Sequence, residues 1–384
     1  MSQQIDKNIN LKALLRILLV KNIPFVSYRL PNTPDIYTFI QLSNPERISS
    51  FKQIEEKRGF IVVPFSNKKA DNTFFISPDI ILKNSDFGDE IFEEINRYKD
   101  IETEKAIPST PLTTSSEEFL SNVTEVISLT QRKRMDKVVI SRIKVTKVSE
   151  NFRTEEFFCN LSDKYPTAMT YLFQIPEAGC WAGATPELLL TIENKNNTAK
   201  TVSLAGTQYK TEKSVDEHIW EKKEREEQEI VSDFIENILK ESKISGYKRS
   251  EPRNIQAGQL IHLQTTFEFP LQKDGQQTEN LLLQLHPTPA IGGFPKQSAC
   301  NFILENERHS RRYYCGFLGP VNFGQQTNLY VNLRCTQLIG EVYVLYAGAG
   351  ITASSVATDE WNETENKMKT IQNVIDFQPN HNPR

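Results

Sequence analysis

Short apolar runs separated by turn residues restrict the fold of this chain most strongly. The segments FVSYRL, IYTFIQL, FIVVPF and TFFISPDIIL have the length of strands and are rich in β-branched and aromatic residues, so residues 20–106 are predicted to be rich in sheet. KVVISRIKV (137–145) also reads as a strand. Helices and strands then alternate irregularly, without the regular cadence of a doubly wound parallel sheet. The pattern predicts an α+β protein that forms one domain across residues 1–384.

Composition excludes several classes of protein. The 384 residues carry a net charge of −4, which gives no electrostatic reason to expect nucleic acid or an anionic membrane as a partner. The five cysteines are scattered, as is typical of reduced thiols in a cytoplasmic protein. No apolar run reaches the roughly 20 residues that span a bilayer. The N-terminal LKALLRILLVK contains Lys12 and Arg16, so it is predicted to be a packed helix and not a signal peptide, with its apolar face at Leu11, Leu14, Leu15, Leu18 and Leu19.

A connection and a helix are predicted between the first strands and the strand at 137. IPSTPLTTSS (107–116) is rich in Pro, Ser and Thr and is interpreted as a connection. Ser115 and Glu118 have the spacing of a capping box. The helix that follows is expected to bury Phe119, Leu120, Val123, Val126 and Ile127.

The stretch HPTPAIGGFP (286–295) directly follows the apolar LLLQL. Three prolines and two adjacent glycines in ten residues fit neither a helix nor an ordinary strand. A tight loop is the simpler interpretation. The alternative is a rigid backbone wall against which a small molecule lies.

Two pairs of glutamates lie on predicted helices. In WEKKEREEQEIVSDFIENIL (220–239), Glu227 shares the predicted inner face and Glu224 lies one turn earlier; that face comprises Trp220, Ile230, Val231, Phe234, Ile235 and Ile238. The second helix, 358–375, carries Glu360 and Glu363. One such pair usually belongs to a solvated face. A carboxylate on an apolar face, however, needs a partner or a cation, and two pairs could surround Mg²⁺.

Four further residues stand out, and each has an ordinary structural interpretation. Lys137 opens a strand, where a lysine is usually solvated, and Glu187 in GATPELLL could be a turn residue. His262 in LIHLQ is by residue type a core histidine. Arg334, inside an apolar alternating strand, needs an anion or a partner. Nucleotide, zinc-protease and serine-hydrolase motifs are missing from the sequence.

Taken in order, these segments resemble the chorismate-utilising enzymes. The resemblance runs from residue 117 to 375, whereas residues 1–110 carry no motif of the family and are expected to form a divergent, sheet-rich N-terminal part. It rests on DKVVISR, GATPELLL, SLAGT, KEREEQEIV, LIHLQTTFE, LHPTPAIGGFP, RRYYCGFLG, NLRCTQL and YAGAGI with DEWNETENKM. It implies two packed antiparallel sheets flanked by helices, with chorismate and Mg²⁺ bound in a deep cleft.

The resemblance also implies roles for particular residues. Glu227 and Glu363 match the Mg²⁺ ligands, and Glu224 and Glu360 match residues that hold metal-bound water. Lys137 matches the general base that activates water, and Glu187 matches the general acid. The residues that match substrate contacts are Gly206, His262, Ala290, Tyr314, Arg334, Gly348 and Lys367.

The same comparison indicates a branch of the family. Lysine at 137, in place of the glutamine usual in ammonia-using members, implies water as nucleophile and no amidotransferase subunit. Ala290 and HPTPA resemble the branch that stops at isochorismate and serves menaquinone or siderophore synthesis. The alternative within the fold is a salicylate synthase, which goes on to release pyruvate. A non-catalytic binding protein is disfavoured because Lys137 and Glu187 are both present, and a monomer is the expected oligomeric state.

Overall fold

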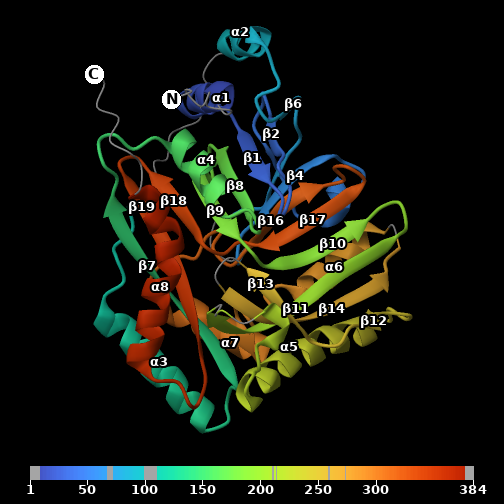
Figure 1. Cartoon of the computed structure of the whole chain (residues 1–384), viewed down its shortest axis with the longest axis vertical. Coiled ribbons are helices and arrows are strands. Elements are labelled where there is room, and N and C mark those ends of the chain that lie inside the picture. The colour runs from blue at the N-terminus through green and yellow to red at the C-terminus, as the bar shows by residue number, and fades with distance from the viewer. Residues whose placement is uncertain are drawn as a thin grey trace.

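The computed structural model describes residues 9–66, 72–98, 110–209, 212, 214–257, 260–272 and 274–376, and the strands in these ranges form two antiparallel sheets (Figure 1). The first sheet has the order β15 (Gly293–Phe294), β7 (Lys137–Lys147), β19 (Val342–Ile351), β18 (Cys335–Ile339), β9 (Gly179–Thr185), β8 (Met169–Ile175), β1 (Phe25–Arg29), β2 (Ile36–Ile40) and β6 (Ile80–Lys83). The second has the order β12 (Lys248–Arg249), β14 (Leu260–Pro270), β11 (Thr198–Tyr209), β10 (Leu188–Glu193), β17 (Gln326–Val331), β16 (Phe317–Val321), β4 (Gly59–Val63), β5 (Phe74–Ile76) and β3 (Glu46–Arg47), and β13 (Arg253–Ala257) pairs with β14. Strands from residues 20–106 therefore enter both sheets.

Helices cover the outer faces of the sheets. Figure 1 shows α8 beside β7 and β19, and α5 running along β11 and β14. The helices are α1 (Ile9–Val20), α2 (Asp89–Arg97), α3 (Ser116–Gln131), α4 (Thr154–Lys164), α5 (Lys222–Glu241), α6 (Gly275–Leu285), α7 (Lys296–Asn306) and α8 (Ala357–Ile375), with short 3₁₀ turns at Phe51–Ile54 and Val215–Glu217.

The first sheet is buried on both faces. In β8, Tyr171 and Phe173 point into the core between the sheets, whereas Leu172 packs into a second core under α1, α4 and α8. Side chains alternate between the faces of a strand, so a strand with both faces buried needs a nearly continuous apolar run, as in TYLF.

The helices predicted in LKALLRILLVK and after Ser115 are both present, with small changes in their buried faces. In α1, Leu11, Leu14, Leu15 and Leu18 are buried, and Leu19 is partly buried. Ser115 caps α3 by accepting a hydrogen bond from the Glu118 amide (3.2 Å). The buried face of α3 is Phe119, Val123, Val126 and Thr130, with Leu120 and Ile127 at its margin.

Within the described residues, the backbone amides on the outer side of β7 do not pair with a long strand. Side chains and a loop carbonyl accept their hydrogen bonds instead. The amide of Val139 donates to Gly292 O (2.9 Å), and that of Ser141 to Glu307 Oε1 (2.7 Å). The amide of Ile143 donates to Thr114 Oγ1 (3.1 Å), and that of Val145 to Thr113 Oγ1 (2.9 Å). The Thr-rich connection thus binds along β7.

Candidate active site

Lys137 begins β7, and the proline-rich stretch lies beside it. Phe294 pairs with Lys137 and Gly293 with Val138, so the end of 286–295 forms the two-residue strand β15 after a turn. A Cβ at Gly293 would lie 2.2 Å from the Lys137 carbonyl oxygen, so only glycine permits this approach. The stretch is a wall next to Lys137, and Ala290 lies partly buried in the turn that precedes that pairing.

Glu187 lies in the short link between β9 and β10, where its carbonyl accepts a hydrogen bond from the Val331 amide (2.9 Å). Desolvation raises the pKa of its partly exposed side chain to about 7, against the opposing effect of Lys137, Lys367 and Arg334. These three cations come from β7, α8 and the β17–β18 link. The carboxyl group therefore keeps its proton to a higher pH than an ordinary glutamate, as a general acid requires.

Arg334 links the C-terminal helix to the centre of the sheets. Its NH1 donates to Lys367 O (3.2 Å) and Thr370 Oγ1 (3.4 Å), and its backbone is left-handed (φ 47°). Desolvation lowers the pKa of this guanidinium, and the neighbouring Tyr314 and Glu363 oppose that effect. Arg334 was expected to need an anion or a partner, and it has hydrogen-bond partners on α8 and the charge of Glu363 nearby.

Lys367 and Tyr314 meet at Gly348. Lys367 Nζ donates to Gly348 O (2.8 Å) and forms an ion pair with Glu363 one turn earlier on α8. A Cβ at Gly348 would lie 3.1 Å from the Tyr314 hydroxyl oxygen, which places that phenol directly over the glycine. Tyr314 is buried and stacks on Tyr346, with ring centroids 5.5 Å apart.

A hydrogen bond joins the His262 ring, on β14, to the backbone of Gly206, on β11. His262 Nδ1 lies 2.9 Å from Gly206 O, and because a carbonyl only accepts, Nδ1 carries the hydrogen. Desolvation, with a smaller effect of Arg334, lowers the pKa of His262, so the ring is neutral at pH 7 and Nε2 is its acceptor. Gly206 has φ +65°, and a Cβ there would lie 2.7 Å from the Trp220 ring.

The acidic pairs are only partly described. Glu224 lies on α5, and its buried Oε2 has no hydrogen-bond partner, as expected of a carboxylate that holds a cation or its water. Glu360 is partly buried and Glu363 is exposed, both on α8, whereas the Glu227 side chain lies outside the described part. Among the described side chains no group of three His, Cys, Asp or Glu converges on one point, so the predicted metal set stays a prediction. The predicted inner face of α5 was wrong at Ile230, which is 51% exposed; the helix instead buries Gln228 and Ser232.

Sequence reasoning missed several residues that hold these groups in place. Gln228 donates from Nε2 to Ser203 Oγ (2.8 Å) and Thr265 Oγ1 (3.1 Å), which fixes α5 on β11 and β14. Arg142 donates to Thr364 Oγ1 (2.6 Å) and so fixes α8 on β7. Gln228 could have been found from the sequence, because it is a polar residue at a position of the helix that faces the core.

Comparison with known proteins identifies the family. Residues 44–376 match the family described as chorismate binding enzyme, and the chain belongs to it. In sequence the chain is similar to isochorismate synthase EntC of Escherichia coli (strain K12), with 30% identity over 265 residues, covering 67% of this chain and 66% of that protein. It is also similar to the vibriobactin-specific isochorismate synthase of Vibrio cholerae, with 26% identity over 319 residues, covering 81% and 78%.

Solved structures show the same fold. MenF, the menaquinone-specific isochorismate synthase of Escherichia coli, superimposes with a TM-score of 0.75 at 19% identity, covering 92% of this chain and 88% of that one. Anthranilate synthase component I of Streptococcus pneumoniae gives 0.63 at 18% identity, covering 91% and 92%. The predicted α+β fold of two antiparallel sheets and the predicted family are confirmed, as is the prediction of an enzyme similar to isochorismate synthases, which are isomerases. Within the described residues, no helix is both long and apolar enough to cross a membrane.

Proposed function

We propose that the protein is an isochorismate synthase, which converts chorismate to isochorismate for menaquinone or siderophore synthesis. One observation carries the proposal: a carboxyl group with a pKa near 7, Glu187, shares its site with the lysine that begins β7. An acid that holds its proton at neutral pH and an amine that can accept one are the two groups needed to add water and remove a hydroxyl. Relatives named isochorismate synthases support the proposal.

The reaction is balanced as an exchange of hydroxyl groups. Lys137 takes a proton from water as the water oxygen bonds to C2 of the ring. The ring double bond shifts, the C4–O bond breaks, and Glu187 gives its proton to the departing hydroxyl, which leaves as water. One water enters and one leaves, so the product is an isomer of the substrate.

The other residues bind and orient the substrate in this proposal. Arg334 and Tyr314 hold the enolpyruvyl carboxylate, because a guanidinium and a phenol both donate to carboxylate oxygens. Lys367, fixed on Gly348, adds a second cation. His262 Nε2 accepts from a ring hydroxyl, and the Gly206 backbone can approach the substrate closely because no side chain intervenes.

Mg²⁺ belongs to the proposal as the partner of the acidic pairs. Glu227 and Glu363 would hold it directly, and Glu224 and Glu360 would hold its water; the unsatisfied Glu224 Oε2 supports this donor set. When bound, the ion would neutralise the ring carboxylate of chorismate. Glu363 also pairs with Lys367, so this carboxylate would be shared between two cations.

The test is product analysis with purified protein, chorismate and Mg²⁺. Isochorismate without pyruvate supports the proposal, released pyruvate with salicylate indicates the lyase alternative, and no turnover refutes it. Lys137→Gln is expected to lower kcat by about 10²–10⁴-fold, the usual contribution of one general base. Lys147→Gln, at the far, exposed end of β7, is the matched control and should retain activity.

A further inference from the structure

A buried ion pair between Glu307 and Arg311 lies beside the candidate site and is not explained by substrate binding. Glu307 follows α7 and is 5% exposed; Arg311 is 4% exposed. Arg311 Nε donates to Glu307 Oε2 (2.8 Å) and NH2 donates to Oε1 (2.6 Å), a bidentate contact. Each side chain retains hydrogen-bonding capacity beyond this contact.

The remaining donors of Arg311 and one carboxylate oxygen of Glu307 form hydrogen bonds with backbone groups of the candidate site. Arg311 NH2 donates to Val139 O (2.6 Å) in β7, and NH1 donates to Ile291 O (3.0 Å) in the wall 286–295. Glu307 Oε1 accepts from the Ser141 amide, two residues further along β7. One guanidinium therefore fixes the distance between the strand that begins with Lys137 and the wall next to it.

Tyr314 lies close to the same arginine, through its backbone and through its ring. The Tyr314 amide donates to Arg311 O (2.8 Å), so the chain turns back on itself between these two residues. The guanidinium lies 4.6 Å from the centre of the Phe65 ring, which covers one side of it. The guanidinium also lies 6.0 Å from the centre of the Tyr314 ring, so β7, the wall and Tyr314 all lie against this one side chain.

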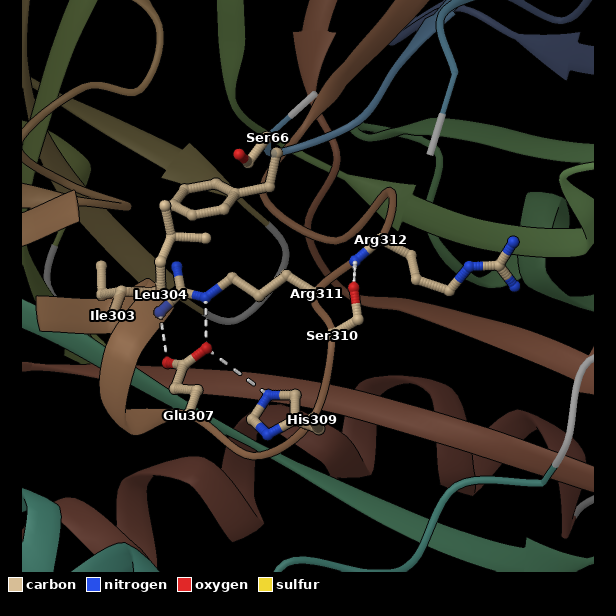
Figure 2. A pocket seen from close by; sticks show the side chains of 9 residues that line it. Ser66, Ile303, Leu304, Glu307, His309, Ser310, Arg311 and Arg312 are labelled. Carbon is tan, nitrogen blue, oxygen red and sulfur yellow. Dashed lines mark hydrogen bonds and ion pairs between the residues drawn. The ribbon is translucent and has the colours of Figure 1, made fainter. Parts of the chain in front are cut away.

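Figure 2 shows the pair at the edge of a small hollow, with His309 pointing toward Glu307. His309 Nε2 lies 2.9 Å from Ser141 Oγ and 3.6 Å from Glu307 Oε2. The hollow measures about 20 Å³, which is room for about one water molecule and far too little for a metabolite. The hollow is too small to be a metabolite site, so ligand binding does not explain the buried pair. A structural role does.

We infer that Glu307 and Arg311 are positioning residues that set Lys137, the wall 286–295 and Tyr314 in register with one another. Neither side chain is among the groups proposed to contact the substrate. The inference rests on the proposed function for the roles of Lys137 and Tyr314. The anchoring itself rests on the hydrogen bonds and ring contacts given above.

Arg311→Lys is the first variant for the test. Lysine keeps the positive charge, but a single ammonium cannot hold the carboxylate and both carbonyls in a planar arrangement. Because a displacement of about 1 Å can cost 10²-fold in rate, kcat per folded molecule is expected to fall by about 10–100-fold, with a much smaller change in KM. Leu15→Ala in α1 is the control for lost stability, because it lies in the other core: its kcat should stay normal.

A second variant keeps the test valid if Arg311→Lys does not fold. Glu307→Gln with Arg311→Met replaces both charges together, which avoids leaving one charge buried alone. It should fold and show the same loss of kcat. Normal kcat in both Arg311 variants, measured well below their unfolding temperatures, overturns the inference.

Hydrogen exchange measures the anchoring without turnover. The amides of Ser141, Ala290, Ile291 and Gly292 should exchange faster in Arg311→Lys than in wild type, and Leu15→Ala should leave their exchange unchanged relative to that of the rest of β7. If the wild type makes no isochorismate, the proposed function fails while exchange still decides the anchoring. Unchanged exchange at Ser141 and the wall overturns the inference even where activity falls.

Discussion

Replacing Glu187 by glutamine should stabilise the protein at alkaline pH while stopping its reaction. In the folded protein the pKa of Glu187 is about 7, against an ordinary value of 4.5. The unfolded chain therefore loses this proton first, and the stability linked to it is fully present below pH 4.5 and is lost as pH rises through 7. A difference of about 2.5 pKa units corresponds to about 3 kcal/mol at 1.36 kcal/mol per unit, an upper figure because the side chain is partly exposed.

Glutamine does not titrate, so the comparison isolates the carboxyl group. Urea unfolding in excess chelator at pH 4.5 and pH 8.5 should give nearly equal free energies of unfolding for both proteins at the lower pH. At the higher pH the variant should be more stable by about 2–3 kcal/mol. Glu193→Gln, exposed at the end of β10, is the matched control and should show no such trend. A difference that stays within about 0.5 kcal/mol across this range would refute the desolvation argument.

Three further outcomes are expected. Gly350→Ala should lower kcat by about 10²-fold with little loss of stability, because the new Cβ would lie 2.5 Å from Lys137 Cε, near the flexible end of the proposed base. A normal kcat would show that catalysis does not need the lysine side chain in that position. Excess chelator, or Glu227→Gln or Glu363→Gln, should nearly abolish turnover with an unchanged circular dichroism spectrum, and full activity in chelator would remove Mg²⁺ from the proposal. Ala290→Thr should shift the products toward pyruvate and salicylate, measured by a lactate dehydrogenase assay; isochorismate alone at an unchanged rate would show that this position does not select the branch.

Local patterns in the sequence predicted helices and strands, but not all of the contacts that these elements make. The strand at 137–145 was predicted from a run of strand-forming residues, and the helix in LKALLRILLVK (11–21) from the helical spacing of its leucines. The need of Arg334 for an anion or a partner followed from the cost of burying a guanidinium, and the structure gives it hydrogen-bond partners on α8 and the nearby charge of Glu363. These predictions need only a residue and its immediate sequence.

Contacts between distant segments could not be predicted in this way. Thr113 and Thr114 were interpreted as part of a connection, yet both bond to β7, about 30 residues along the chain. Arg311 carried no periodic signal, because its partners are backbone atoms of β7 and the wall, which sequence does not place near it. The error at Ile230 has a similar origin: the buried polar group Gln228, held by Ser203 and Thr265, turns the inner face of α5 away from a purely apolar stripe.

The side-chain acceptors along β7 have a consequence beyond catalysis. β7 is long and apolar, and among the described residues only the two of β15 pair with its outer side, so the remaining outward amides would otherwise attract a strand from another molecule. Glu307, Thr114 and Thr113 occupy three successive outward amides, and no incoming backbone can bond there without displacing them. The chain thereby closes its own sheet edge against aggregation with residues that lie far apart in sequence. Thr113→Val with Thr114→Val would reopen that edge while leaving every group proposed to touch chorismate in place.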